Sequence, residues 1–132
     1  DTYDTEAQRF LVYDDERWDC KLFPNYKTSE YDNEASVVEH ISADLNIAKR
    51  NISCRYITSK VQEKYSVSHN ENRIYNHRLY EVNIQKFPEI MKKDDFVMGG
   101  KHYYWMKIQE MEKDTRIMKV NMDVVDFIKE NL

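Results

Sequence analysis

The clearest pattern of apolar residues in the chain predicts a helix over residues 33–47. Apolar side chains recur there at three- and four-residue spacing, at Val37, Val38, Ile41 and Leu45. This spacing places them on one face of an α-helix. Asn33 is a suitable N-cap, and Asn46 can take the left-handed conformation that often ends a helix.

Two pairs of strands flank this helix in the sequence. Residues 8–13 and 19–23 predict a short β-hairpin, because the polar run 14–17 between them is compatible with a turn. Residues 52–67 and 74–84 are rich in β-branched residues and tyrosine, and a polar loop, 68–72, separates them. We expect these two segments to form a long antiparallel hairpin.

The last third of the chain predicts one more strand and a closing helix. Phe87-Pro88 interrupts the hairpin pattern, Gly99-Gly100 marks a turn, and residues 102–108 are a candidate strand. The closing helix has an apolar stripe made of Val124, Val125, Phe127, Ile128 and Leu132. Strands and helices in this order predict an α/β fold.

Length and charge narrow the possible functions. The chain has 132 residues, which predicts a single domain over 1–132. A net charge of -4 argues against binding to long nucleic acid, which needs many unopposed cations, but allows a small anionic ligand in a local basic pocket. Two isolated cysteines favour a reducing compartment. Because the chain starts at Asp1 rather than Met, we expect a fragment that lacks an N-terminal segment.

Three stretches of the sequence resemble the Nudix family. Residues 18–24 (WDCKLFP) resemble the approach to the Nudix box, 33–47 (NEASVVEHISADLNI) resembles the box helix, and 102–132 resembles the last strand and helix of the family. The resemblance implies a Nudix-like α/β/α sandwich, with a mixed β-sheet, a central box helix and a C-terminal helix.

The box departs from the family where its metal ligands should stand. In this alignment His40 takes the place of the first helix glutamate, and Ala43 and Asp44 take the place of the Glu-Glu pair. Asn25-Tyr26 replaces the Gly-Gly. Nudix hydrolases hold Mg²⁺ or Mn²⁺ on these glutamates, because hard cations prefer oxygen ligands presented on one helix face. We therefore expect no catalytic residue, no metal, no cofactor and no enzyme activity.

A degenerate box in a tyrosine-rich chain is similar to the Nudix-like domains associated with bacterial nucleotidyltransferases of cyclic-oligonucleotide antiphage systems. That resemblance implies a cytoplasmic effector domain that senses a nucleotide or cyclic nucleotide and reaches the membrane only through a preceding segment. Two alternatives stay open. One is a protein-interaction or structural domain, and the other is a residual hydrolase that uses Asp44 with Glu30, Asp32 or Glu34. Formation of a homo-oligomer also stays open.

The candidate ligand-binding residues lie mainly on the long hairpin. Cations and aromatic side chains alternate there and suit a nucleotide, because guanidinium groups bind phosphate and aromatic rings stack on bases. An ordinary solvated sheet face is the competing interpretation, since glutamates are interleaved. Tyr26 adjoins the altered loop, and the carboxamide of Asn121 could either read a base edge or cap the final helix. The complete set is Tyr26, Arg55, Tyr75, His77, Arg78 and Asn121.

Overall fold

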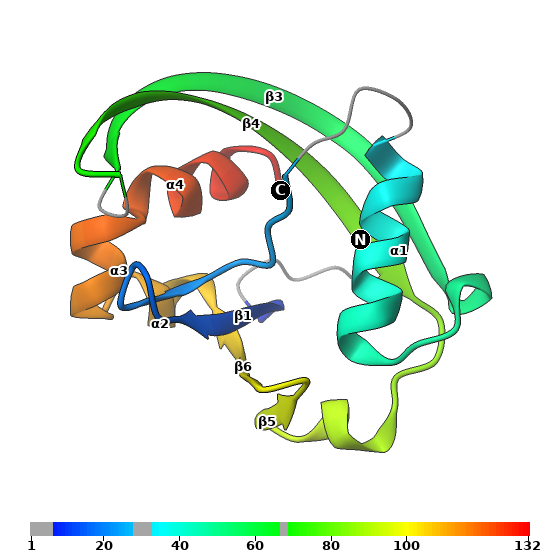
Figure 1. The fold of residues 1–132 in the computed structure, drawn as a ribbon. Helices are drawn as coiled ribbons and strands as arrows, with labels where there is room; N and C mark the ends of the chain where they lie inside the picture. Colours follow the sequence, from blue (N-terminus) through cyan, green and yellow to red (C-terminus); the bar gives the residue numbers. More distant parts are fainter. Residues whose placement is uncertain (1–6, 28–32, 67–68) are drawn as a thin grey trace. The chain divides into compact units, whose positions relative to one another are not determined.

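The computed structural model describes residues 7–27, 33–66 and 69–132 and shows a mixed α/β protein with antiparallel sheets and several helices (Figure 1). The chain divides into two compact units. The first, here called the terminal unit, comprises Asp1–Asn25 and Lys93–Leu132. The second, here called the hairpin unit, comprises Tyr26–Lys92. Each unit is described by itself.

The terminal unit is built on a four-stranded antiparallel sheet with the order β2-β1-β6-β5. Its strands are β1 (Arg9–Asp15), β2 (Cys20–Leu22), β5 (Asp95–Met98) and β6 (Lys101–Lys107). The helices α2 (Ile108–Met111), α3 (Thr115–Val120) and α4 (Met122–Glu130) follow β6 directly. Sheet and helices share one apolar core, formed by Val12, Cys20, Ile108, Met111, Ile117 and Val125.

A buried carboxylate organises the turn between β1 and β2. Asp15 accepts a hydrogen bond from the hydroxyl of Tyr13 at 3.0 Å and one from the backbone N–H of Trp18 at 3.0 Å. Asn25 in turn donates to the Tyr13 oxygen at 3.1 Å. Asp19, in the same turn, has a left-handed φ of 50°. The side chain of Asp15 therefore holds the turn from inside, because both of its oxygens accept bonds from the chain around it.

The hairpin unit contains a long antiparallel ribbon and one helix (Figure 1). The strands β3 (Ile52–Ser66) and β4 (Glu71–Ile84) pair along their whole length, with one irregularity between Tyr56 and Thr58. Helix α1 (Asn33–Leu45) packs alongside β3. Short 3-10 helices, η1 (Lys49–Asn51) and η2 (Glu89–Lys92), follow α1 and β4. The buried apolar residues of this unit are Ile41, Leu45, Ile47, Ile52 and Met91.

Most of the predicted elements are present. The short hairpin, the helix, the long hairpin and the strand after Gly99-Gly100 all form, with most boundaries within about two residues of those expected in the described part. The exception is β4, which begins at Glu71, three residues before the expected start and inside the expected loop. Asn46 has a φ of 55°, so it ends α1 in the left-handed conformation as predicted. Asn33 is the first residue of α1. The predicted end of the long strand at Val67 lies outside the described residues.

Three details of the sequence-based prediction were incomplete or wrong. Strand β5 and helices α2 and α3 were not predicted, because each is too short to show a hydrophobic period. Leu132 is half exposed beyond the end of α4 and does not belong to the apolar stripe. Asn121 occupies the N-cap position of α4 as predicted, but its side chain does not make the expected capping hydrogen bond.

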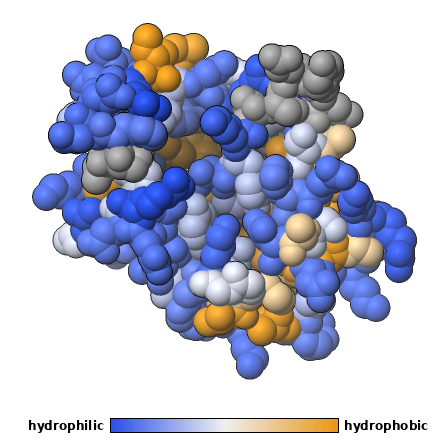
Figure 2. Space-filling view, in the orientation of Figure 1, coloured by the Kyte–Doolittle hydropathy of each residue, from blue (hydrophilic) through white to orange (hydrophobic). Residues whose placement is uncertain are grey.

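The surface is mainly hydrophilic on the face that Figure 2 shows, with separate smaller apolar areas. Within the described ranges, no helix combines the length and apolar character that crossing a bilayer requires. Exposed apolar side chains are present on the ribbon, where Val61 is 69% and Ile74 is 74% exposed.

Candidate functional site

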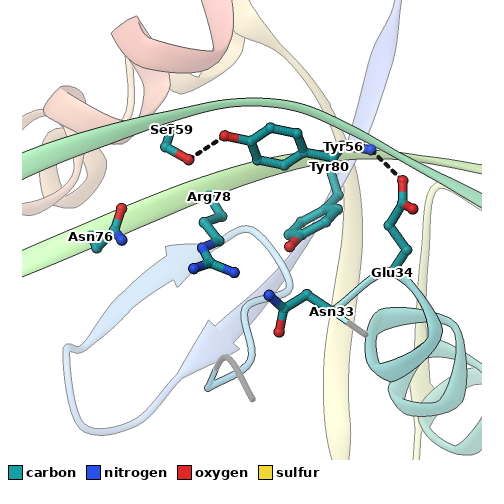
Figure 3. Close-up of a pocket in the computed structure, with 7 residues that line it drawn as sticks. All are labelled: Asn33, Glu34, Tyr56, Ser59, Asn76, Arg78 and Tyr80. Atoms are coloured by element: carbon teal, nitrogen blue, oxygen red, sulfur yellow. Dashed lines mark hydrogen bonds between the residues drawn. The ribbon is translucent and has the colours of Figure 1, made fainter. Parts of the chain in front are cut away.

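A pocket of about 330 Å³ lies in the hairpin unit, between the first turn of α1 and one face of the β3–β4 ribbon (Figure 3). Its volume is at the lower end of the range for small-molecule sites. The described residues that line it are Asn33 and Glu34 from α1, Tyr56 and Ser59 from β3, and Asn76, Arg78 and Tyr80 from β4.

The pairing of the two strands brings the ribbon residues of the pocket together. Tyr56 pairs with Tyr80 and Ser59 with Arg78 across the ladder. Directly opposed residues of an antiparallel pair project from the same face, so these four side chains share one face. The backbone N–H of Tyr56, next to the irregularity, donates to Glu34 Oε2 at 2.8 Å and ties α1 to β3.

Two tyrosines give the pocket an aromatic wall. The rings of Tyr56 and Tyr80 have centroids 5.6 Å apart and planes inclined by 64°, an edge-to-face arrangement. The hydroxyl of Tyr56 shares a hydrogen bond with Ser59 Oγ, which fixes the ring. Tyr56 is nevertheless 45% exposed, so part of its aromatic surface is accessible to a ligand.

The pocket also contains opposite charges that do not pair with one another. Within the described part of the chain, the guanidinium of Arg78 makes no hydrogen bond and no ion pair. The carboxylate of Glu34 accepts the bond from Tyr56 but makes no ion pair with a described residue. Figure 3 shows the Tyr80 ring between these two side chains in that view. An unpaired guanidinium in a pocket is suited to binding an anionic group.

Of the six ligand-binding residues predicted from the sequence, only Arg78 lines this pocket. Adjacent residues of a strand point to opposite faces, so His77 and Tyr75 project from the other side of β4. There their rings stack with centroids 5.8 Å apart. Arg55 is also on that side, where it forms a cross-strand ion pair with Glu81 at 3.3 Å. The predicted basic and aromatic cluster is thus divided between two faces.

Tyr26 contacts the helix that resembles the Nudix box. Its ring stacks on that of His40, with centroids 4.5 Å apart, and its hydroxyl donates to Asp44 Oδ2 at 2.7 Å. These contacts attach Tyr26, the first residue of the hairpin unit, to α1. They engage His40 and Asp44, which both take the places of family glutamates in the sequence alignment. Over the described ranges, no three His, Cys, Asp or Glu side chains gather in a way that could hold a metal ion.

Asn121 belongs to the terminal unit and is buried. Its backbone N–H donates to Ile117 at 2.8 Å, and its backbone oxygen accepts from Val124 and Val125. Two of the carboxylates considered for residual hydrolysis, Glu30 and Asp32, lie outside the described residues. The third, Glu34, lines the pocket.

Six of the seven described residues that line the pocket were not among the candidates predicted from the sequence. The register of the hairpin was the signal that could have found them, because the partners of Arg78 follow once the two strands are aligned. No protein-family model, curated protein or solved structure matches this chain significantly.

Proposed function

We propose that the hairpin unit binds a nucleotide in the pocket between α1 and the ribbon, and that the protein senses this ligand without hydrolysing it. The observation that carries the proposal is the guanidinium of Arg78, which is unpaired among the described residues, beside the aromatic wall of Tyr56 and Tyr80. Guanidinium groups bind phosphate through charge-assisted hydrogen bonds, and an exposed aromatic face stacks on a base. One pocket therefore offers groups for both halves of a nucleotide.

The wider proposal follows from the sequence resemblance. The chain is a Nudix-like sandwich with an inactive box, and it acts as the cytoplasmic sensor of a cyclic oligonucleotide in a bacterial antiphage effector. The box positions support the loss of catalysis, because His40 and Ala43 stand where the family has carboxylates. Arg78 provides the pocket with a cationic group for a small anion, although the whole chain is acidic.

A protein-interaction role is the second candidate, and one observation favours it. Val61 and Ile74 are more exposed than most apolar residues, at 69% and 74%, on the outer part of the ribbon. Exposed apolar side chains that lie near one another often mark contact surfaces. This role requires no ligand in the pocket.

Binding of nucleotides to matched variants tests the proposal. We expect linear or cyclic nucleotides to bind the wild type, and Arg78→Ala to weaken binding by about 10- to 100-fold, the equivalent of losing one charge-assisted interaction. Arg55→Ala is the control, because it removes the same charge from the opposite face of the ribbon. Isothermal titration calorimetry measures affinity, and far-ultraviolet circular dichroism checks folding. If no nucleotide binds, the proposal is wrong and the interaction role takes its place.

A further inference from the structure

The charges of the pocket restrict the ligand further than the proposed function does. Arg78 and Glu34 line the same pocket, yet they form no ion pair with each other. A ligand carrying only phosphate would leave the carboxylate of Glu34 unfavourably close to another anion. A ligand with an anionic group at one end and hydrogen-bond donors at the other would complement both side chains.

Resting on the proposed function, we infer that the pocket selects guanine among the nucleobases, with Glu34 reading the base and Arg78 binding the phosphate. A carboxylate is an acceptor only, with two oxygens that can each accept more than one bond. Glu34 Oε2 takes the backbone N–H of Tyr56, which fixes the side chain but leaves capacity on both oxygens. The complementary base must therefore present donors.

Guanine is the base that presents two adjacent donors, N1–H and the N2 amino group, on its pairing edge. Adenine and cytosine each place one amino donor beside a ring nitrogen that accepts, and uracil flanks its single N–H with two carbonyls. Acceptors facing a carboxylate are repelled. Recognition of amino donors on bases by Glu or Asp is an established mode of direct readout.

The size of the pocket limits how much of the ligand enters it. A volume of about 330 Å³ is small for this class of site, and among the described lining residues the one cation is Arg78. The pocket therefore takes one guanosine unit with a single phosphate. A cyclic oligonucleotide would insert one of its nucleotides and leave the others outside the pocket.

Titration of GMP, AMP, CMP and UMP into the wild type, Glu34→Gln and Arg78→Ala tests this inference. We expect the wild type to prefer GMP over AMP by about 10-fold or more, the discrimination of one good base contact. Glu34→Gln keeps an acceptor for the Tyr56 N–H but turns an amide donor toward the donors of guanine, so the GMP preference should disappear. Arg78→Ala should weaken GMP and AMP together and keep their ratio.

Glu63→Gln is the control for Glu34→Gln, because it removes the same charge from the ribbon at a residue that does not line the pocket. Circular dichroism of each variant confirms folding. If all four nucleotides bind with similar affinity, the guanine inference is overturned while the nucleotide-binding function stands. If the GMP preference survives Glu34→Gln, the assignment to Glu34 is overturned. If no nucleotide binds, both the inference and the proposed function fall.

Discussion

Replacing Asp15 with alanine should destabilise the terminal unit far more than the same change at its neighbour Asp14. The two carboxylates lie side by side on β1 but face opposite sides of the strand. Asp15 is 7% exposed and accepts bonds from the Tyr13 hydroxyl and the Trp18 backbone. Asp14 is 49% exposed, and accepts a bond from the Tyr104 hydroxyl at 2.8 Å.

The magnitude follows from the bonds that each change removes. A hydrogen bond to a charged group contributes about 1.5 to 3 kcal/mol, and a buried donor left without a partner adds a desolvation cost. Asp15→Ala removes two such bonds, but it also removes the cost of burying a carboxylate. We expect a net loss of about 2 to 4 kcal/mol in the free energy of unfolding. Asp14→Ala should cost at most about 1 kcal/mol, because its interactions are exposed to solvent.

Tryptophan fluorescence is the assay suited to this comparison. Both tryptophans of the chain, Trp18 and Trp105, belong to the terminal unit, so their emission during urea denaturation reports the unfolding of that unit. Asp15→Asn should be intermediate, since an amide keeps one acceptor. Equal losses for Asp14→Ala and Asp15→Ala, or a loss below about 1 kcal/mol for Asp15→Ala, would refute the conclusion that the buried carboxylate stabilises the turn.

Two further predictions concern proton binding and the core. Burial, with hydrogen bonds to Asp15 and Asp14 respectively, raises the pKa of Tyr13 and of Tyr104 from 10.0 to about 12. The folded state keeps these protons after the unfolded chain has lost them, so the free energy of unfolding should fall as the pH rises from 10 to 12. Tyrosinate absorbance measures the pKa values, and titration of all ten tyrosines near the ordinary value of 10.0 would contradict the prediction. Leu45→Ala should cost about 2 to 5 kcal/mol, because this side chain is 1% exposed, whereas Leu45→Met should cost less than about 1.5 kcal/mol. Denaturation followed by circular dichroism measures the free energy of unfolding of both variants. Equal losses would show that the packing of this side chain does not determine the stability.

The elements that the sequence predicted well are those with several turns or several alternations. Helix α1 and the strands β3 and β4 are long enough for apolar periodicity to be visible, and Asn46 and Gly99-Gly100 were suited to their left-handed backbone. Strand β5 and helix α2 have four residues each, so no period could reveal them. Asn121 has a residue type that favours capping, but its buried side chain makes no capping bond.

The candidate site depended on information that a local pattern does not contain. The sequence alone indicated that cations and tyrosines alternate along the hairpin, and it named Arg78, which lines the pocket. It did not show that a pocket lies on the face of the ribbon to which Arg78 points, while its neighbour His77 points to the opposite face. Nor did it show that Glu34, 22 residues earlier in the chain, accepts a hydrogen bond from the backbone N–H of Tyr56.

Local structure depends on backbone preferences and on side chains within a few residues, so the sequence of each segment is enough to predict it. The pocket arises instead from strand register and from the packing of α1 on β3, which depend on contacts between residues distant in the chain. The sequence by itself therefore determined which long segments become helix or strand, and it indicated Arg78 as a candidate cation for an anionic ligand. Only the tertiary structure decided which charges share a pocket and which are already paired.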